Sequence, residues 1–142
     1  MEQQECIGCK IVNKEMSTRI IYEDDYTVGV LDIKPRFAKG QCVVLPKKHA
    51  EHVYDLEEED AAHLFRGIKE VARKIEKIYK PDHVAMFVRG RTFPHAHVIL
   101  FPVFSIPEDL VGQLIRSITL YESRTQISDV ELDEIAAKLK LS

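Results

Sequence analysis

The chain has 142 residues, a length that fits one domain with a hydrophobic core of its own. Its 45% hydrophobic and 30% charged residues exclude disordered, collagen-like and coiled-coil proteins. A formal net charge of -3 provides no basic field for a nucleic-acid polymer, so we expect no such partner.

The first half of the chain is typical of β-strands. Two short β-branched runs, 19–22 and 27–31, are joined by the acidic turn-forming pair at 24–25, and together they predict an antiparallel hairpin. A third strand is expected at 41–45. It should stop at Pro46, because proline has no N–H to donate to a sheet.

A long helix is predicted next. Asp55 and Glu58 have capping-box spacing, and the helix should end before Pro81. Its apolar residues recur at helical intervals and should form the buried face: Leu64, Ile68, Val71, Ala72 and Ile75. Two further strands, 84–88 and 97–101, flank a stretch containing glycine and proline, and they predict a second hairpin.

The end of the chain is predicted to be helical. Apolar residues repeat at helical spacing beyond Phe104, and Ser128 with Glu131 opens a further helix. No repeat or linker divides the chain, so we expect one α+β domain over residues 1–142. Its core should cover about 6–104, followed by a C-terminal helical extension at about 105–142.

The cellular location is predicted from the cysteines and from the apolar stretches. The longest apolar stretch, near Val98 to Phe104, is far shorter than the ~20 residues of a membrane helix, and the N-terminus is polar. Three cysteines are an odd count, and Cys6 and Cys9 are too close in sequence to join distant elements. We therefore expect a cytoplasmic protein with no membrane partner and no disulfide framework.

The Cys6-Ile7-Gly8-Cys9 motif has the spacing with which two thiolates bind one zinc ion. Histidines are the more plausible remaining ligands, since only one other cysteine is present. A redox pair or a chance match remain alternatives, although no βαβ pattern follows to favour the redox pair. His49 and His52 lie in or just after a basic loop that, taken in isolation, is best explained by simple solvation.

The segment Pro94-His95-Ala96-His97 places two imidazoles on one face of the expected strand, with Ala96 and Val98 on the other. Imidazole suits either metal ligation or nucleophilic attack. A surface pair without function is as plausible from spacing alone, because short motifs match by chance.

Read together, four segments closely resemble the histidine-triad nucleotide-binding proteins, from Cys6 to about Pro102. These segments are 20–25, 31–35, 44–49 and 90–97. The resemblance implies an α+β domain with a five-stranded antiparallel sheet and one long helix. It also implies pairing into a homodimer through a continuous sheet.

The resemblance implies an enzyme that hydrolyses or transfers nucleoside monophosphates. His97 would attack the α-phosphorus of a purine nucleotide conjugate: a phosphoramidate, a nucleotidyl ester or a dinucleoside polyphosphate. The product would be a nucleotidyl-histidine that water or another acceptor resolves. A hydrogen bond from Nδ1 of His97 to the strand's own backbone would leave Nε2 free to attack.

The resemblance also assigns the nucleotide site. Asp32 would accept both ribose hydroxyls, and three apolar residues that otherwise read as ordinary core would hold the base: Ile11, Val30 and Ile33. Thr92 matches the hydroxyl residue that binds the α-phosphate. Arg91 stands where the family usually has glutamine, and it is either a further phosphate ligand or a plain surface charge.

The zinc-bearing branch of this family, which galactose-1-phosphate uridylyltransferases resemble, implies a structural zinc ion. In this chain its ligands would be Cys6, Cys9, His49 and His95. His52 is the main competitor of His49 as a ligand.

The largest departure from the family pattern is Ile99, which stands where a third motif histidine is expected. Losing a general acid typically lowers the rate by ~10²–10⁴. Two alternatives to an enzyme therefore stay open: a nucleotide-binding module with little or no turnover, and a zinc-stabilised interaction domain. The uridylyltransferases also lack this histidine, so its loss does not by itself imply inactivity.

Overall fold

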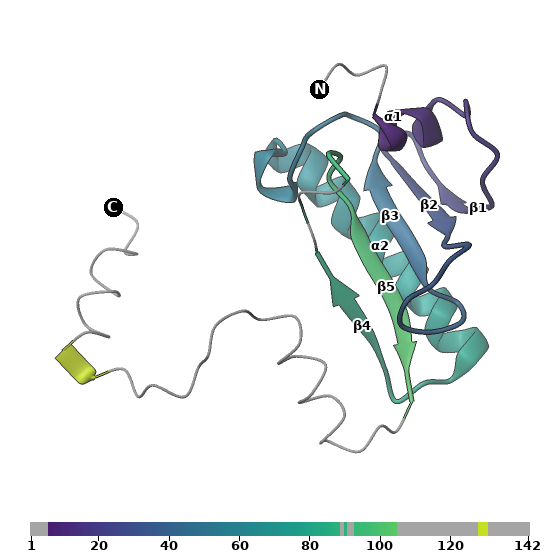
Figure 1. Cartoon of the computed structure of the whole chain (residues 1–142), viewed down its shortest axis with the longest axis vertical. Coiled ribbons are helices and arrows are strands. Elements are labelled where there is room, and N and C mark those ends of the chain that lie inside the picture. The colour runs from purple at the N-terminus through teal and green to yellow at the C-terminus, as the bar shows by residue number, and fades with distance from the viewer. Residues whose placement is uncertain (1–5, 89, 91–92, 105–127, 131–142) are drawn as a thin grey trace. The chain divides into compact units, whose positions relative to one another are not determined.

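A five-stranded antiparallel sheet organises the chain, as the sequence predicts (Figure 1). The computed structural model describes residues 6–88, 90, 93–104 and 128–130. Contacts divide the chain into two units, residues 1–105 and 106–142. The prediction of one domain with a helical extension stays a prediction, because most of residues 105–142 lie outside the described residues. Of the three residues described there, 128–130, the last two are helical.

The strands follow the β-branched runs closely. They are β1 (Ile20–Glu23), β2 (Thr27–Leu31), β3 (Cys42–Pro46), β4 (His83–Phe87) and β5 (Val98–Val103). The order across the sheet is β1-β2-β3-β5-β4, with every neighbouring pair antiparallel. Both predicted hairpins are thus confirmed. The first turn is held by Asp24, whose Oδ1 accepts hydrogen bonds from the backbone N–H groups of Tyr26 and Thr27 at 2.8 and 2.7 Å.

Up to residue 104, the described part of the chain forms the helices α1 (Ile7–Val12) and α2 (Glu58–Tyr79), with a short 3₁₀ helix at Val53–Asp55. The predicted start of the long helix was wrong, because Glu57 is the residue that precedes its first turn. Asp55 instead bonds back to His52, the residue before the 3₁₀ helix. Lys80 ends α2 in the left-handed conformation, so the helix stops before Pro81 as expected.

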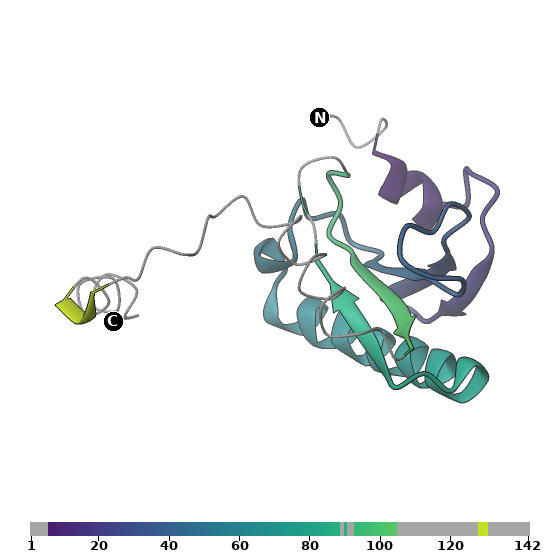
Figure 2. The same cartoon turned by 60° about the horizontal axis from the view of Figure 1, so that its bottom comes forward.

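Two apolar clusters lie on opposite faces of the sheet. The predicted face of α2 packs on one side through Leu64, Ile68, Val71 and Ile75, against Cys42, Val44, Val98 and Leu100. On the other side, Ile11 of α1 packs with Val28, Val30 and Leu45. Figure 2 shows the sheet between the two helices. The second face is thinly covered, which leaves room for a site beside α1.

Within the described residues, no helix combines the length and the apolar character that crossing a membrane requires.

Candidate functional site

The two motif histidines, His95 and His97, lie in the segment immediately before β5. The prediction that they belong to the strand was wrong: β5 begins at Val98. The backbone N–H of Ala96 donates to the carbonyl of Ala50 at 2.7 Å, a contact from the loop after β3 that holds the segment outside the sheet ladder. Both imidazoles are buried, with His95 0% and His97 8% exposed.

The ring of His95 has a fixed orientation. Its Nε2 lies 2.8 Å from the carbonyl oxygen of Pro46, the last residue of β3. Since a carbonyl oxygen only accepts, Nε2 carries the proton and Nδ1 keeps its lone pair. Nδ1 lies 3.5 Å from Sγ of Cys6 and 3.6 Å from Sγ of Cys9. A backbone carbonyl thus prepares this ring to act as a ligand through Nδ1, the usual arrangement behind a metal-bound histidine.

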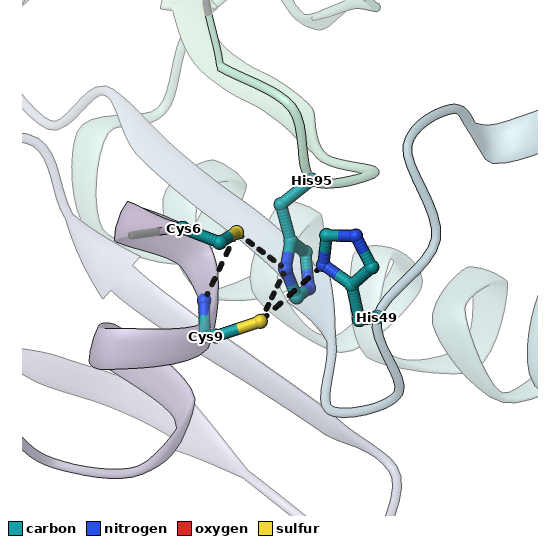
Figure 3. Close-up of side chains that lie close together, drawn as sticks. All are labelled: Cys6, Cys9, His49 and His95. Atoms are coloured by element: carbon teal, nitrogen blue, oxygen red, sulfur yellow. Dashed lines mark hydrogen bonds between the residues drawn. The ribbon is translucent and has the colours of Figure 1, made fainter. Parts of the chain in front are cut away.

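The first turn of α1 brings the two cysteines together. Cys6 caps the helix, and its Sγ accepts a hydrogen bond from the backbone N–H of Cys9 at 3.5 Å. His49 approaches from the loop after β3, with Nδ1 3.3 Å from Sγ of Cys9. Figure 3 shows these side chains converging with His95 on one point.

Gly8 makes this convergence possible. A Cβ built on Gly8 would lie 2.3 Å from Cγ and 2.6 Å from Nδ1 of His95, far inside normal contact. The first turn of α1 can therefore rest against the imidazole only because residue 8 has no side chain. The sequence motif contains this glycine, but its role depends on a contact with a residue 87 positions away and gave no local signal.

The four side chains fit a tetrahedral metal ion. Their ligand atoms all lie within 4.8 Å of one another. Sulfur and nitrogen ligands at ~2.0–2.3 Å from one ion would be separated by about 3.5 Å, and the S–N separations are 3.3, 3.5 and 3.6 Å. His52 is not part of the cluster: its Nδ1 bonds to Asp55.

Burial shapes the protonation of the cluster. Burial and the hydrogen bond with Cys6 raise the pKa of the Cys9 thiol to about 11. Burial lowers the pKa of His95, which favours the neutral imidazole that metals bind. Without a cation the raised pKa keeps the proton on the Cys9 thiol, and a bound cation would replace it.

His97 is oriented by its own segment. Its Nδ1 lies 2.7 Å from the carbonyl oxygen of His95, so Nδ1 carries the proton and the lone pair sits on Nε2. The expected hydrogen bond to the backbone is therefore present. Burial lowers the pKa of His97, which again favours the neutral ring. An edge-to-face contact with Phe93, with ring centroids 4.6 Å apart, holds the imidazole in place.

A cavity of about 390 Å³ lies beside His97 on the α1 side of the sheet. Four of the residues predicted to bind a nucleotide line it, namely Ile11, Val30, Asp32 and Ile33. Arg91 and Thr92 lie outside the described residues. The cavity wall also includes Val43, which pairs with Val30 across β2 and β3 and was missed from sequence. Ile99 also belongs to the wall.

Asp32 is locked in place by two hydrogen bonds. Its Oδ1 accepts from the backbone N–H of Lys34 at 2.8 Å, and its Oδ2 accepts from Nε2 of Gln41 at 2.6 Å. Gln41 is buried, and its own oxygen accepts from the backbone N–H of Phe37 at 3.1 Å. Each carboxylate oxygen keeps a further lone pair for a ligand. Sequence reasoning found Asp32 but not Gln41.

Comparison with known proteins gives one consistent result. A family model described as the HIT domain matches residues 13–106. An uncharacterised HIT-like protein of Methanocaldococcus jannaschii is 27% identical over 139 residues, covering 95% of this chain and 98% of the relative.

Two further proteins show how far the similarity extends. A crystal structure from Streptococcus mutans has a TM-score of 0.76 at 27% identity, covering 94% of this chain and 82% of that one. An adenosine 5'-monophosphoramidase of Schizosaccharomyces pombe is 34% identical over 70 residues, covering 49% of this chain and 52% of the relative.

Proposed function

The chain belongs to the HIT domain family, and from that premise we propose that it is a hydrolase or nucleotidyltransferase acting at the α-phosphate of a purine nucleotide conjugate. The family includes nucleotide-binding proteins and hydrolases, among them the phosphoramidase of Schizosaccharomyces pombe. The substrate would be a nucleoside phosphoramidate, a nucleotidyl ester or a dinucleoside polyphosphate.

The orientation of His97 carries this proposal. Because Nδ1 donates to the carbonyl of His95, Nε2 holds a lone pair that no described residue engages. In the first step Nε2 attacks the α-phosphorus, and the bond to the leaving group breaks. In the second step water or another acceptor attacks the same phosphorus, and the electron pair of the P–N bond returns to Nε2. The carbonyl of His95 stabilises the positive charge that the ring carries in between.

The nucleoside would occupy the cavity on the α1 side. We assign the free lone pairs of Asp32 to the ribose hydroxyls and the apolar wall of Ile11, Val30 and Ile33 to the base. Arg91 and Thr92 are proposed phosphate ligands on the strength of the sequence alone.

For the cluster of Cys6, Cys9, His49 and His95 we propose zinc. Two sulfur and two nitrogen ligands at tetrahedral separations are the donor set that zinc prefers. With no position left for water or substrate, such a site would be structural. It would fasten α1 to the segment that carries His97, and thereby hold both walls of the nucleoside cavity.

We also propose a homodimer in the cytoplasm. β4 forms one edge of the sheet and leaves Met86 half exposed, which suits pairing with a second copy. A reducing compartment would keep the thiols of the metal cluster free. Analytical ultracentrifugation of the full chain tests the dimer, and a monomer at micromolar concentration would contradict it.

The second candidate is a nucleotide-binding module with little turnover. Ile99 favours it, because its apolar side chain lies in the wall beside His97 where a proton donor would assist departure. The two candidates differ in kinetics: the enzyme consumes its ligand, whereas the module binds it unchanged.

Steady-state turnover separates them. We propose assaying the full chain with adenosine 5'-phosphoramidate, an aryl ester of AMP and a dinucleoside polyphosphate, beside His97→Ala. His63 in α2 supplies the matched control, because it is an imidazole that lines none of the described cavities. Hydrolysis that His97→Ala abolishes and His63→Gln preserves supports the proposal. Nucleotide binding without turnover of any of these compounds supports the module.

A further inference from the structure

A second cavity of about 390 Å³ also reaches His97, and it is formed by other parts of the chain. Among the residues that the structure describes, His97 is the only one that it shares with the nucleoside cavity. Its wall includes His52, Tyr54, Val88, Gly90 and Ala96. His97 therefore stands between two separate spaces, and a group attached to the α-phosphorus opposite the nucleoside has the second cavity to occupy.

His52 is a second imidazole in this cavity, and its ring is held by Asp55 and Tyr54. Its Nδ1 lies 3.0 Å from Oδ2 of Asp55, and its backbone N–H donates to the same oxygen at 3.1 Å. The ring of Tyr54 stacks on it at 4.8 Å with an interplanar angle of 7°. Since a carboxylate oxygen only accepts, the proton between His52 and Asp55 belongs to Nδ1.

The opposite edge of the His52 ring faces Gly90. A Cβ built on Gly90 would lie 3.0 Å from Cδ2 and 3.3 Å from Nε2 of His52. Nε2 of His52 thus lies beside Gly90, in the wall of the second cavity, to which His97 also belongs. A carboxylate that fixes Nδ1 and leaves Nε2 for proton transfer is the general arrangement of a catalytic imidazole.

We propose that His52 is a catalytic residue that transfers the proton of the leaving group, and that Asp55 positions it. The inference rests on the proposed function and answers the question raised by Ile99, namely which residue protonates the departing atom. Asp55 lies within the 3₁₀ helix that follows His52, so the local backbone conformation holds the two side chains together.

The proton balance closes over the two steps. In the proposed starting state His52 carries a proton on each ring nitrogen, with Nδ1 donating to Asp55. As Nε2 of His97 forms its bond to phosphorus, the leaving oxygen or nitrogen takes the electron pair of the broken bond and the proton from Nε2 of His52. His52 is then neutral, with its remaining proton on Nδ1. In the second step Nε2 of His52 accepts a proton from the attacking water as that water bonds to phosphorus, which restores the starting state.

The test is the dependence of rate on the leaving group. We would measure kcat/KM of the full chain for a series of aryl esters of AMP, from p-nitrophenyl to unsubstituted phenyl, with adenosine 5'-phosphoramidate alongside. A departing p-nitrophenolate needs little protonation, whereas phenolate and amines need much. The variants are His52→Gln and Asp55→Ala. The control is His63→Gln, since His63 also stacks on a tyrosine, Tyr26, and faces a carboxylate, Glu59.

We expect His52→Gln to lower kcat/KM by about 10²-fold or more for the phenyl ester, and far less for the p-nitrophenyl ester. Asp55→Ala should also make kcat/KM depend more steeply on the leaving group, but by a smaller amount. His63→Gln should leave this dependence unchanged. Loss of protein stability would instead lower all rates alike.

Two results would overturn the inference. In the first, His52→Gln shows the same dependence of kcat/KM on the leaving group as the parent chain, while His97 still forms a nucleotidyl adduct with the p-nitrophenyl ester. This result refutes the role of His52 and leaves the proposed function standing. In the other, no adduct forms on His97 with any ester, and both proposals fail together.

Discussion

Replacing Gly8 by alanine tests how α1 is joined to the catalytic segment. In most helices Gly→Ala stabilises the protein by roughly 0.5–1 kcal/mol. At this position the new Cβ would lie 2.3 Å from Cγ of His95, so one of the two must move by more than about 1 Å to reach ordinary contact. His95 is fully buried and bonded to the carbonyl of Pro46, so α1 is the element that yields.

The expected effects follow from that displacement. Overpacking of this kind costs about 1–3 kcal/mol, which for a chain of this size lowers Tm by about 3–10 °C. Metal ligation tolerates errors of only about 0.2 Å, so Gly8→Ala should also lose most of its bound zinc. The assays are calorimetry of the metal-free chain and elemental analysis after desalting.

A matched control lies in the same helix. Ile7 is 48% exposed, and Ile7→Ala should shift stability by no more than about 0.5 kcal/mol and keep its metal. If Gly8→Ala instead raises Tm, as alanine does in an ordinary helix, and binds zinc fully, then α1 does not rest on His95 and the structural role of the cluster is refuted.

Two further predictions concern the metal cluster and the nucleoside cavity. Cys9→Ser should abolish stoichiometric zinc binding and make Tm insensitive to chelators. Cys42→Ala, in β3 away from the cluster, should still bind zinc and should still lose Tm when a chelator is added. Equal zinc content in the two variants would contradict the ligand assignment. Gln41→Leu removes the hydrogen bond that fixes Oδ2 of Asp32. Because a hydrogen bond to a charged group contributes about 1.5–3 kcal/mol, the variant should bind AMP about tenfold or more weakly, as measured by calorimetry, with kcat little changed. Unchanged affinity would show that Asp32 does not hold the ribose.

Local sequence signals were enough to predict the elements of the fold. β-Branched runs gave β1 and β2 to within a residue, and the helical period gave α2, because each pattern reflects the face that the element buries. The start of α2 was missed because Asp55 was taken as the residue that caps this helix. Its side chain instead accepts hydrogen bonds from His52, the residue before the preceding 3₁₀ helix. Spacing alone does not reveal such a choice between partners.

The metal cluster was predictable only through the family resemblance, and its physical basis lies in the sheet. β3 and β5 are antiparallel neighbours, with Val44 paired to Val98. The residues that follow β3 therefore lie beside those that precede β5, and this brings His49 next to His95 (Figure 3). From the residues alone, the loop that carries His49 was best explained by solvation, because that pairing joins positions about 50 apart in the sequence.

Contacts between distant residues escaped prediction for the same reason. The hydrogen bond from Ala96 to Ala50 keeps the histidines out of β5, and no pattern within 93–97 announces it. Gln41 reads as the first residue of a strand, yet its amide is what holds Asp32. Residues that act by touching another part of the chain become visible only once the register is known.

The most direct test of the account is a rapid-quench experiment on the full chain with the p-nitrophenyl ester of AMP, followed by intact-protein and peptide mass spectrometry. The account predicts an added adenylyl group on His97, formed in a burst together with p-nitrophenol and absent from His97→Ala. Undiminished turnover by His97→Ala, or an adduct on a different residue, would contradict it.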